Sequence, residues 1–141
     1  MRCLIFALVL TACGPTTVAS SEPAASSQTG STKVAPKTMG NIDIAGFKAK
    51  IDANEVAALF DVRTAGEFGG GHVKGAVNVP LQNLASNMSM FEPYKGDTIY
   101  LICQSGGRSS RAGKTLAAAG YDVVNVQGGT GGWVAAGHAV D

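Results

Sequence analysis

The chain has 141 residues, which suffices for one domain with a buried core but not for two domains of ordinary size. A net charge of +1 gives no electrostatic reason to expect nucleic acid or an acidic surface as a partner. Two of the three cysteines, Cys3 and Cys13, lie close to the N-terminus, so Cys103 is the only thiol expected in the folded part. No histidine stands at metal-site spacing from these cysteines, and we expect neither a metal nor a cofactor.

Residues 1–13 have the features of an export signal. A basic start is followed by an apolar run over residues 3–10, which would span about 12 Å as a helix, far less than the ~30 Å core of a bilayer. The run closes with Leu-Thr-Ala before Cys13, which resembles the lipobox of bacterial lipoproteins. That resemblance implies a signal peptide over residues 1–12, cleavage before Cys13 and lipidation of Cys13. An ordinary signal peptide cut at another small residue is the alternative.

The stretch after Cys13 is rich in Ser, Thr, Ala, Pro and Gly and has no apolar periodicity. Such a composition cannot bury enough surface to offset the entropy of ordering. We therefore predict that residues 13–40 are the lipidated cysteine and a flexible linker, with a reach of roughly 30 Å. The lipoprotein resemblance implies a location in the cell envelope, and Gly14 indicates the periplasmic face of the outer membrane if the cell is Gram-negative.

Residues 41–141 are predicted to form the folded domain. Short apolar runs predict buried strands over residues 56–62, 76–79, 98–102 and 123–126, and helices are predicted over 46–51, 81–90, 108–119 and 133–136. Thr64 and Glu67 fit a capping box that starts one more short helix, which the glycines at 69–71 end. Strands that are apolar on both faces and alternate with helices indicate an α/β fold with a covered parallel sheet.

Cys103 follows the strand over residues 98–102, and a Gly-rich turn then leads into a helix. Unpaired N–H groups and the positive end of a helix dipole favour a thiolate at such a place and lower the pKa of the thiol. Gly106 and Gly107 would let backbone N–H groups converge on the sulfur. The pattern therefore predicts a reactive nucleophile at the carboxyl end of a strand, where ligands of such sheets bind.

Three ordered motifs resemble the signatures of the rhodanese domain. Residues 61–64 read Asp-Val-Arg-Thr and begin a motif that runs to Pro80, residues 103–109 read Cys-Gln-Ser-Gly-Gly-Arg-Ser, and residues 128–138 contain Gly-Gly, a tryptophan and Ala-Gly-His. The resemblance covers residues 41–141. It implies a small three-layer α/β/α domain with a mostly parallel sheet of about five strands.

The resemblance also implies a sulfurtransferase. In this family the loop cysteine, here Cys103, takes the outer sulfur of thiosulfate or a persulfide donor and forms a persulfide. A thiol or cyanide then accepts the sulfur, so the reaction has two half-reactions. The implied partners are a small sulfur-containing anion, an acceptor such as a periplasmic thiol protein, and the membrane through the lipid anchor; no nucleic acid is expected.

The remaining candidate residues surround the loop. We predict substrate binding by the loop residues and by one arginine that follows a strand end: Gln104, Ser105, Gly106, Gly107, Arg108 and Arg63. Arg63 could instead hold Glu67 or the loop in an ion pair. Arg111 and Lys114 share a helix side with Arg108 and are expected to form a solvated face. Asp61, Glu67 and His72 are expected to be structural, with His72 hydrogen-bonded near the strand end at Asp61.

Two other functions are weighed against this one. A phosphatase or arsenate reductase related to the cell-division-cycle phosphatases shares the fold but has a Cys-x5-Arg loop. Cys103 and Arg108 form the shorter Cys-x4-Arg, a smaller cradle suited to sulfur. A catalytically inactive rhodanese-like binding module usually lacks the cysteine.

Overall fold

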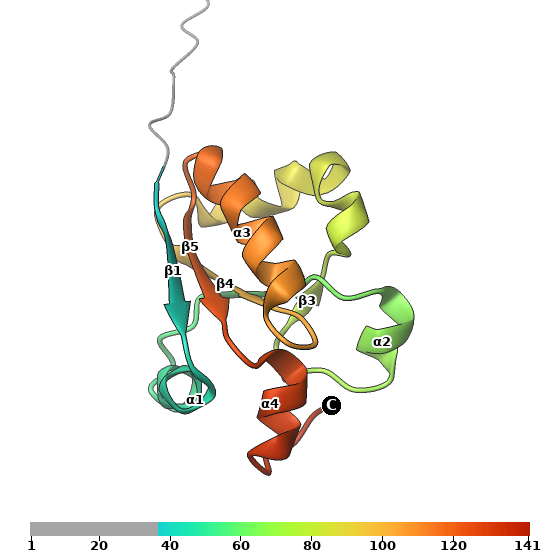
Figure 1. Cartoon of the computed structure of the whole chain (residues 1–141). Coiled ribbons are helices and arrows are strands. Elements are labelled where there is room, and N and C mark those ends of the chain that lie inside the picture. Colours follow the sequence, from blue (N-terminus) through green and yellow to red (C-terminus); the bar gives the residue numbers. More distant parts are fainter. Residues whose placement is uncertain (1–36) are drawn as a thin grey trace, which may run out of the picture. The chain divides into compact units, whose positions relative to one another are not determined.

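A computed structural model of the chain describes residues 37–141, which form one α/β domain (Figure 1). The expected signal peptide, the expected lipidation at Cys13 and most of the expected linker lie outside these residues. None of the helices within residues 37–141 has the length and hydropathy needed to cross a bilayer.

Five parallel strands form a single sheet in the order β1-β5-β4-β2-β3. The strands are β1 (Met39–Ile42), β2 (Ala58–Asp61), β3 (Val77–Asn78), β4 (Thr98–Ile102) and β5 (Asp122–Val126). β4 lies at the centre, between β2 and β5, and its bounds are those predicted from the apolar run. The predicted α/β fold with a parallel sheet is confirmed.

The N-terminal edge of the domain differs from the prediction. The sequence pattern places residues 39–40 in the linker, whereas the structure places them in β1, where Met39 pairs with Val123 and Ile42 with Val126. The N–H of Lys37 also donates to the carbonyl of Ala117 at 3.0 Å. The segment Met-Gly-Asn-Ile carries no strand pattern of its own, because an edge strand is held mainly by backbone bonds to its neighbour.

Helices cover both faces of the sheet. One face carries α1 (Ile44–Asp52) and α4 (Gly129–Ala135), and the other carries α3 (Gly107–Ala118) with the 3-10 segments η1 (Leu81–Asn83) and η2 (Ala85–Tyr94). Side chains of β4 alternate between two cores. Ile99, Leu101 and Cys103 pack on the α3 side, and Tyr100 and Ile102 pack on the α1 side. Cys103 therefore faces α3 from the end of the central strand.

The helix predicted over residues 81–90 is replaced by η1 and η2. Asn87 has non-helical dihedral angles (φ −115°, ψ 22°), and Pro93 lies within η2. The apolar positions 81, 84, 88 and 91 include two pairs spaced by three residues, the spacing at which side chains of a 3-10 helix align. Phe91 is fully buried and its ring centroid lies 4.5 Å from that of Phe60, so this segment is fixed by packing on the sheet.

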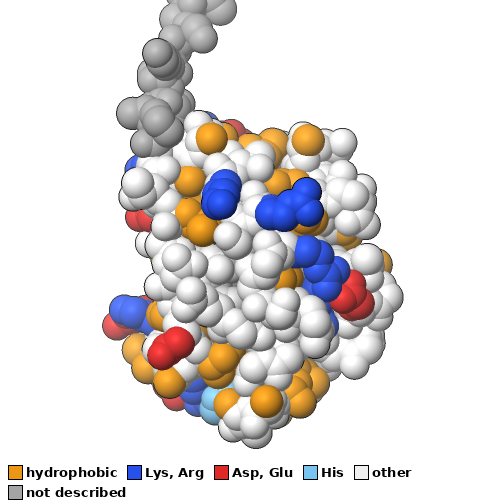
Figure 2. All heavy atoms as spheres, in the orientation of Figure 1, with side chains coloured by type: hydrophobic (Ala, Val, Ile, Leu, Met, Phe, Trp, Pro, Cys, Tyr) orange, Lys and Arg blue, Asp and Glu red, His pale blue; other side chains and the backbone are white. Residues whose placement is uncertain are grey.

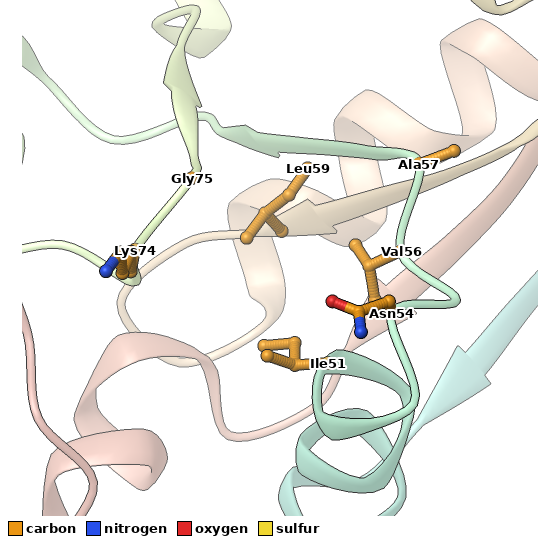
Figure 3. A pocket seen from close by; sticks show the side chains of 7 residues that line it. All are labelled: Ile51, Asn54, Val56, Ala57, Leu59, Lys74 and Gly75. Carbon is orange, nitrogen blue, oxygen red and sulfur yellow. The ribbon is translucent and has the colours of Figure 1, made fainter.

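A cavity at the far end of the strands lies away from Cys103 (Figure 3). It is bounded by the end of α1, by residues 56–57 ahead of β2 and by residues 74–75 ahead of β3. Its polar side chains are Lys74 and Asn54, and Ile51, Val56 and Leu59 form its apolar wall. Since parallel strands share one direction, this cavity is at their amino ends, opposite the edge that carries the cysteine.

Candidate active site at the Cys103 loop

The thiol of Cys103 lies in a tight loop between β4 and α3. The cysteine is 1% exposed, and Gly106, at the start of α3, has φ 102°. This left-handed conformation, which suits glycine, turns the N–H of Gly106 toward the sulfur, to which it donates at 3.1 Å. The Ser109 hydroxyl lies 3.3 Å from the same sulfur. Gly107 is the first residue of α3.

The net effect of this environment favours the thiolate. Burial raises the pKa of the Cys103 thiol, but hydrogen bonds from the Ser109 hydroxyl and from the N–H groups of Ser109, Ser105 and Gly106 lower it, and the lowering prevails. Donors aimed at a sulfur stabilise its charged form and disfavour the neutral one. Of the two glycines predicted to bring N–H groups to the sulfur, Gly106 donates to it.

The start of α4 binds the loop through backbone hydrogen bonds. Thr130 N–H donates to the Cys103 carbonyl at 2.7 Å, and Gly131 N–H donates to the Gln104 carbonyl at 3.0 Å. A Cβ atom on Gly129 would lie 2.2 Å from that Cys103 oxygen, so only glycine allows this approach. The helix predicted over residues 133–136 accordingly begins four residues earlier, and two of its glycines, Gly129 and Gly131, lie against the loop.

Arg108 on α3 is bound to Glu67 on α2 (Ala65–Gly69) rather than standing free. Its Nη1 and Nη2 atoms lie 2.7 and 2.6 Å from the two carboxylate oxygens of Glu67, and both side chains are about one third exposed. Glu67 also accepts from the N–H of Thr64 at 3.0 Å, which completes the predicted capping box. The Arg108 guanidinium, and then Thr64, hold the pKa of Glu67 well below its usual range.

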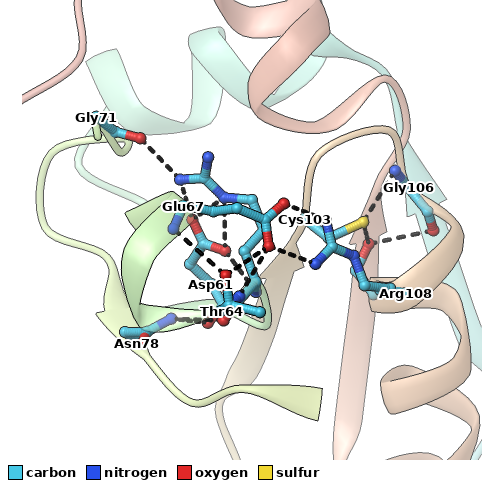
Figure 4. A network of polar contacts seen from close by, with 10 residues as sticks. Asp61, Thr64, Glu67, Gly71, Asn78, Cys103, Gly106 and Arg108 are labelled. Atoms are coloured by element: carbon cyan, nitrogen blue, oxygen red, sulfur yellow. Dashed lines mark hydrogen bonds and ion pairs between the residues drawn. The ribbon is translucent and has the colours of Figure 1, made fainter. Parts of the chain in front are cut away.

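Arg63 forms a second, buried pair with Asp61. Its Nε atom lies 2.8 Å from Asp61 Oδ2, its Nη2 atom lies 2.8 Å from the carbonyl of Gly71, and the residue is 3% exposed. The ion pair of Arg63 with Glu67 or the loop, one of the alternatives that the sequence leaves open, is not formed, because Arg63 binds Asp61 and Arg108 binds Glu67. Figure 4 shows Asp61, Glu67 and Arg108 in one network of polar contacts, close to Cys103.

The His72 side chain contacts Phe68 rather than the strand end at Asp61. Its Nδ1 atom lies 3.1 Å from the Phe68 carbonyl, and its ring stacks on that of Phe68 with centroids 3.8 Å apart. Its backbone exchanges two hydrogen bonds with Asp141. The strand end at Asp61 is instead held by Asn78, whose Nδ2 donates to the carbonyls of Asp61 and Arg63 at 3.0 Å each.

A cavity of about 260 Å³ lies beside the loop. Its walls come from the end of β2, α2, the loop, α4 and the C-terminal segment: Arg63, Glu67, Gly70, Gly71, Gln104, Thr130, Gly131, Val134 and Val140. The Oγ1 atom of Thr130 is buried and has no hydrogen-bond partner within residues 37–141. The structure thus places Gln104 and Arg63 together at one cavity, where substrate binding by them stays a prediction, and adds Thr130, which no sequence motif indicates.

Basic side chains gather on the face that α3 presents (Figure 2). Arg108 and Arg111 line a second hollow with Leu81, Gln82 and Thr115. In the part of the chain that the structure describes, Arg111 and Lys114 take part in none of the five ion pairs. This matches the expected solvated face and leaves positive charge close to the loop. Residues 37–141 contain no cluster of three His, Cys, Asp or Glu side chains able to hold a metal ion.

The fold and the loop define a small α/β domain that presents a cysteine in an anion-stabilising cradle at the carboxyl edge of its sheet. The model of the rhodanese-like domain family matches residues 43–136, and the chain belongs to this family.

Relatives and solved structures agree with the assignment. The chain is 35% identical over 69 residues to thiosulfate sulfurtransferase PspE of Escherichia coli, which covers 49% of this chain and 66% of that protein. It is 42% identical over 84 residues to the chloroplastic thiosulfate sulfurtransferase 16 of Arabidopsis thaliana, and the match covers 52% of this chain and 70% of that protein. A crystal structure of a rhodanese-related protein from Thermoplasma volcanium superposes with a TM-score of 0.65 at 27% identity, over 72% of this chain and 97% of that one. The chain spans only 49% and 60% of two Bacillus subtilis relatives.

Proposed function

We propose that this protein is a sulfurtransferase that moves sulfane sulfur through a persulfide on Cys103. The observation that carries the proposal is the sulfur of Cys103, held 3.1 Å from the Gly106 N–H in a Cys-x4-Arg loop at the end of the central strand. Membership of the rhodanese-like family and the relatives named as thiosulfate sulfurtransferases support it.

The proposed reaction needs no cofactor and no external oxidant. The Cys103 thiolate attacks the outer sulfur of thiosulfate, the sulfur–sulfur bond of the donor breaks, and sulfite leaves with the bonding electron pair. A thiolate or cyanide acceptor then attacks the outer sulfur of the persulfide, and the Cys103 thiolate leaves. A persulfide donor enters the same cycle with its thiolate as leaving group.

The site residues have three roles under this proposal. The loop N–H groups stabilise the thiolate and the persulfide anion, and the cavity at Gln104, Arg63 and Thr130 admits donor and acceptor. Arg108 positions the loop through Glu67 and offers its remaining donors to the dianion. Ser105 contributes through its backbone N–H.

Mass spectrometry of the full-length protein tests the proposal. After treatment with thiosulfate, the tryptic peptide of residues 96–108 should gain one sulfur atom, about 32 Da, which cyanide removes. Cys103→Ala should show no gain, and Cys13→Ala should behave as the parent. If Cys103 reacts with iodoacetamide but with neither thiosulfate nor a persulfide donor, the protein is a binding module. Hydrolysis of an aryl phosphate that depends on Cys103 would instead indicate a phosphatase.

We also propose that the protein is anchored in the cell envelope by lipid on Cys13. The support is the sequence pattern of residues 1–13 and the Ser/Thr/Ala/Pro/Gly-rich stretch that follows. Cys13→Ala should move the protein from the membrane fraction to the soluble fraction, whereas Cys3→Ala should leave it membrane-bound. A Cys13→Ala variant that stays in the membrane fraction would refute the anchor without affecting the proposed reaction.

A further inference from the structure

The hydroxyl of Ser109 is surrounded by acceptors. Its Oγ atom lies 3.3 Å from Cys103 Sγ, 2.6 Å from Asn125 Oδ1 and 3.2 Å from the Gly106 carbonyl oxygen. A serine hydroxyl carries one hydrogen, so it cannot donate fully to all three. Whether the Cys103 sulfur receives that hydrogen depends on whether Asn125 accepts a hydrogen bond from Ser109 or donates one to it.

Asn125 is connected to the surface. It lies on β5, is 4% exposed, and its Nδ2 atom donates to Asn41 Oδ1 on the neighbouring strand β1 at 3.0 Å. Asn41 is exposed. A continuous series of side chains therefore runs from Cys103, which directly follows β4, through Ser109 on α3 and Asn125 on β5 to Asn41 on β1.

Two complete hydrogen-bonding patterns fit these four side chains. When Cys103 is a thiol, its S–H donates to Ser109, Ser109 donates to Asn125 Oδ1, and Asn125 Nδ2 donates to Asn41. When Cys103 is a thiolate, Ser109 donates to the sulfur, Asn125 Nδ2 donates to Ser109, and Asn41 Nδ2 donates to Asn125. Both patterns contain three hydrogen bonds, because an amide presents a donor and an acceptor of nearly the same shape.

We propose that Asn125 and Asn41 form an amide relay that turns the Ser109 hydroxyl toward the Cys103 sulfur whenever that sulfur carries charge. Asn125 is thus a positioning residue, and Asn41 sets its orientation. The relay stabilises the two anionic states of the reaction, the thiolate and the persulfide, without placing a cation beside them. This inference rests on the proposed role of Cys103 as nucleophile.

Asn41→Asp is the sharpest test, because a carboxylate accepts hydrogen bonds but cannot donate. It would hold Asn125 with Nδ2 toward position 41 and Oδ1 toward Ser109, so that Ser109 donates away from the sulfur. We expect the pKa of Cys103 to rise by about one unit, which lowers the thiolate fraction about tenfold at pH values below the parent pKa. Ser109→Ala should raise the pKa by a similar amount, and Asn41→Ala should leave it nearly unchanged.

The readout is the pH dependence of iodoacetamide alkylation of Cys103, followed in the full-length protein on the peptide of residues 96–108. The charged groups around Cys103 are Arg108 on α3 with its partner Glu67 on α2, and the Asp61–Arg63 pair at the end of β2. None of the variants changes these groups. Because the assay needs no sulfur transfer, the relay and the proposed function can fail separately.

Salt and a double variant separate the relay from a long-range charge effect. A surface carboxylate acting through space is screened at 1 M salt, whereas the direction of a hydrogen bond is not. The effect of Asn41→Asp should therefore persist at high salt and vanish in a Ser109→Ala background. An unchanged pKa in Asn41→Asp, a shift that salt abolishes, or a shift that survives Ser109→Ala would each overturn the proposal.

Discussion

Gly129 is the glycine whose replacement would create the shortest contact with the backbone. A Cβ atom there would lie 2.2 Å from the Cys103 oxygen and 2.6 Å from the Gln104 carbonyl carbon. Side-chain carbons essentially never approach other heavy atoms within 3.0 Å, so in Gly129→Ala the oxygen must move by about 0.8 Å. That displacement lies directly under the proposed nucleophile and breaks the 2.7 Å bond from the Thr130 N–H.

The cost has two parts that a control can separate. Gly129 has φ 59°, and an alanine in the left-handed region costs about 1–2 kcal/mol. Gly75 has φ 83° and open space around its Cβ position, so Gly75→Ala carries the conformational cost without the clash. Overpacking adds about 1–3 kcal/mol, so Gly129→Ala should be less stable than Gly75→Ala by that amount.

The expected effect on function is larger than the effect on stability. A misplacement near 1 Å at a reacting group lowers a rate by about 100-fold, so persulfide formation in Gly129→Ala should fall by that order, while Gly75→Ala should match the parent. Urea unfolding and single-turnover reaction with thiosulfate measure the two quantities. If Gly129→Ala is too unstable, Gly131→Ala serves, because its Cβ would meet the Gln104 oxygen at 3.0 Å within a right-handed helix. A Gly129→Ala protein as fast as Gly75→Ala would refute the idea that α4 sets the loop.

Three further outcomes are expected. Thr130→Val should keep the free energy of unfolding or raise it by about 1 kcal/mol, because the buried Oγ1 atom lacks a partner within residues 37–141. If the cavity admits the acceptor, the same variant should raise the KM of a small thiol acceptor in steady-state assays. Phe91→Ala should lower the free energy of unfolding by about 3–5 kcal/mol in urea, since the ring is fully buried against Phe60. The rate of persulfide formation should fall as pH decreases through the lowered pKa of Cys103, because protonation removes the nucleophile, and a rate that is flat through the alkylation pKa would contradict this.

The elements that could be predicted from sequence are those whose signal is local. The apolar run of β4 gave its bounds directly, and the capping box of Thr64 and Glu67 gave the start of α2, because both patterns act within a few residues. β1 could not be found in this way. Its pairing with β5 joins residues that are 84 positions apart in the sequence, and its own four residues carry no strand pattern.

The same distinction applies to the candidate site. The motif places Cys103, Gly106 and Arg108 in one loop, since the spacing alone requires it. It does not identify the partners of the two arginines, because Glu67 and Arg108 are 41 residues apart and Asp61 competes for the same kind of group. The sequence therefore leaves an ion pair of Arg63 with Glu67 or the loop open as an alternative, whereas the structure pairs Arg63 with Asp61. Ser109 and Asn125, 16 residues apart, give no signal until α3 packs on β5.

The arrangement of contacts indicates how the loop divides its tasks. Arg63 and Arg108 both bind carboxylates, so much of their charge serves to fix the end of β2 and α2. The sulfur itself is approached by the Gly106 N–H and the Ser109 hydroxyl, while the two carbonyls behind it are bound by α4. The thiolate thus depends on the Ser109 hydroxyl and on backbone N–H groups, of which that of Gly106 is placed by a glycine conformation. Replacing the exposed side chain of Gln104 should therefore alter substrate affinity more than the pKa of Cys103, whereas changes at Gly106 or Gly129 should alter both.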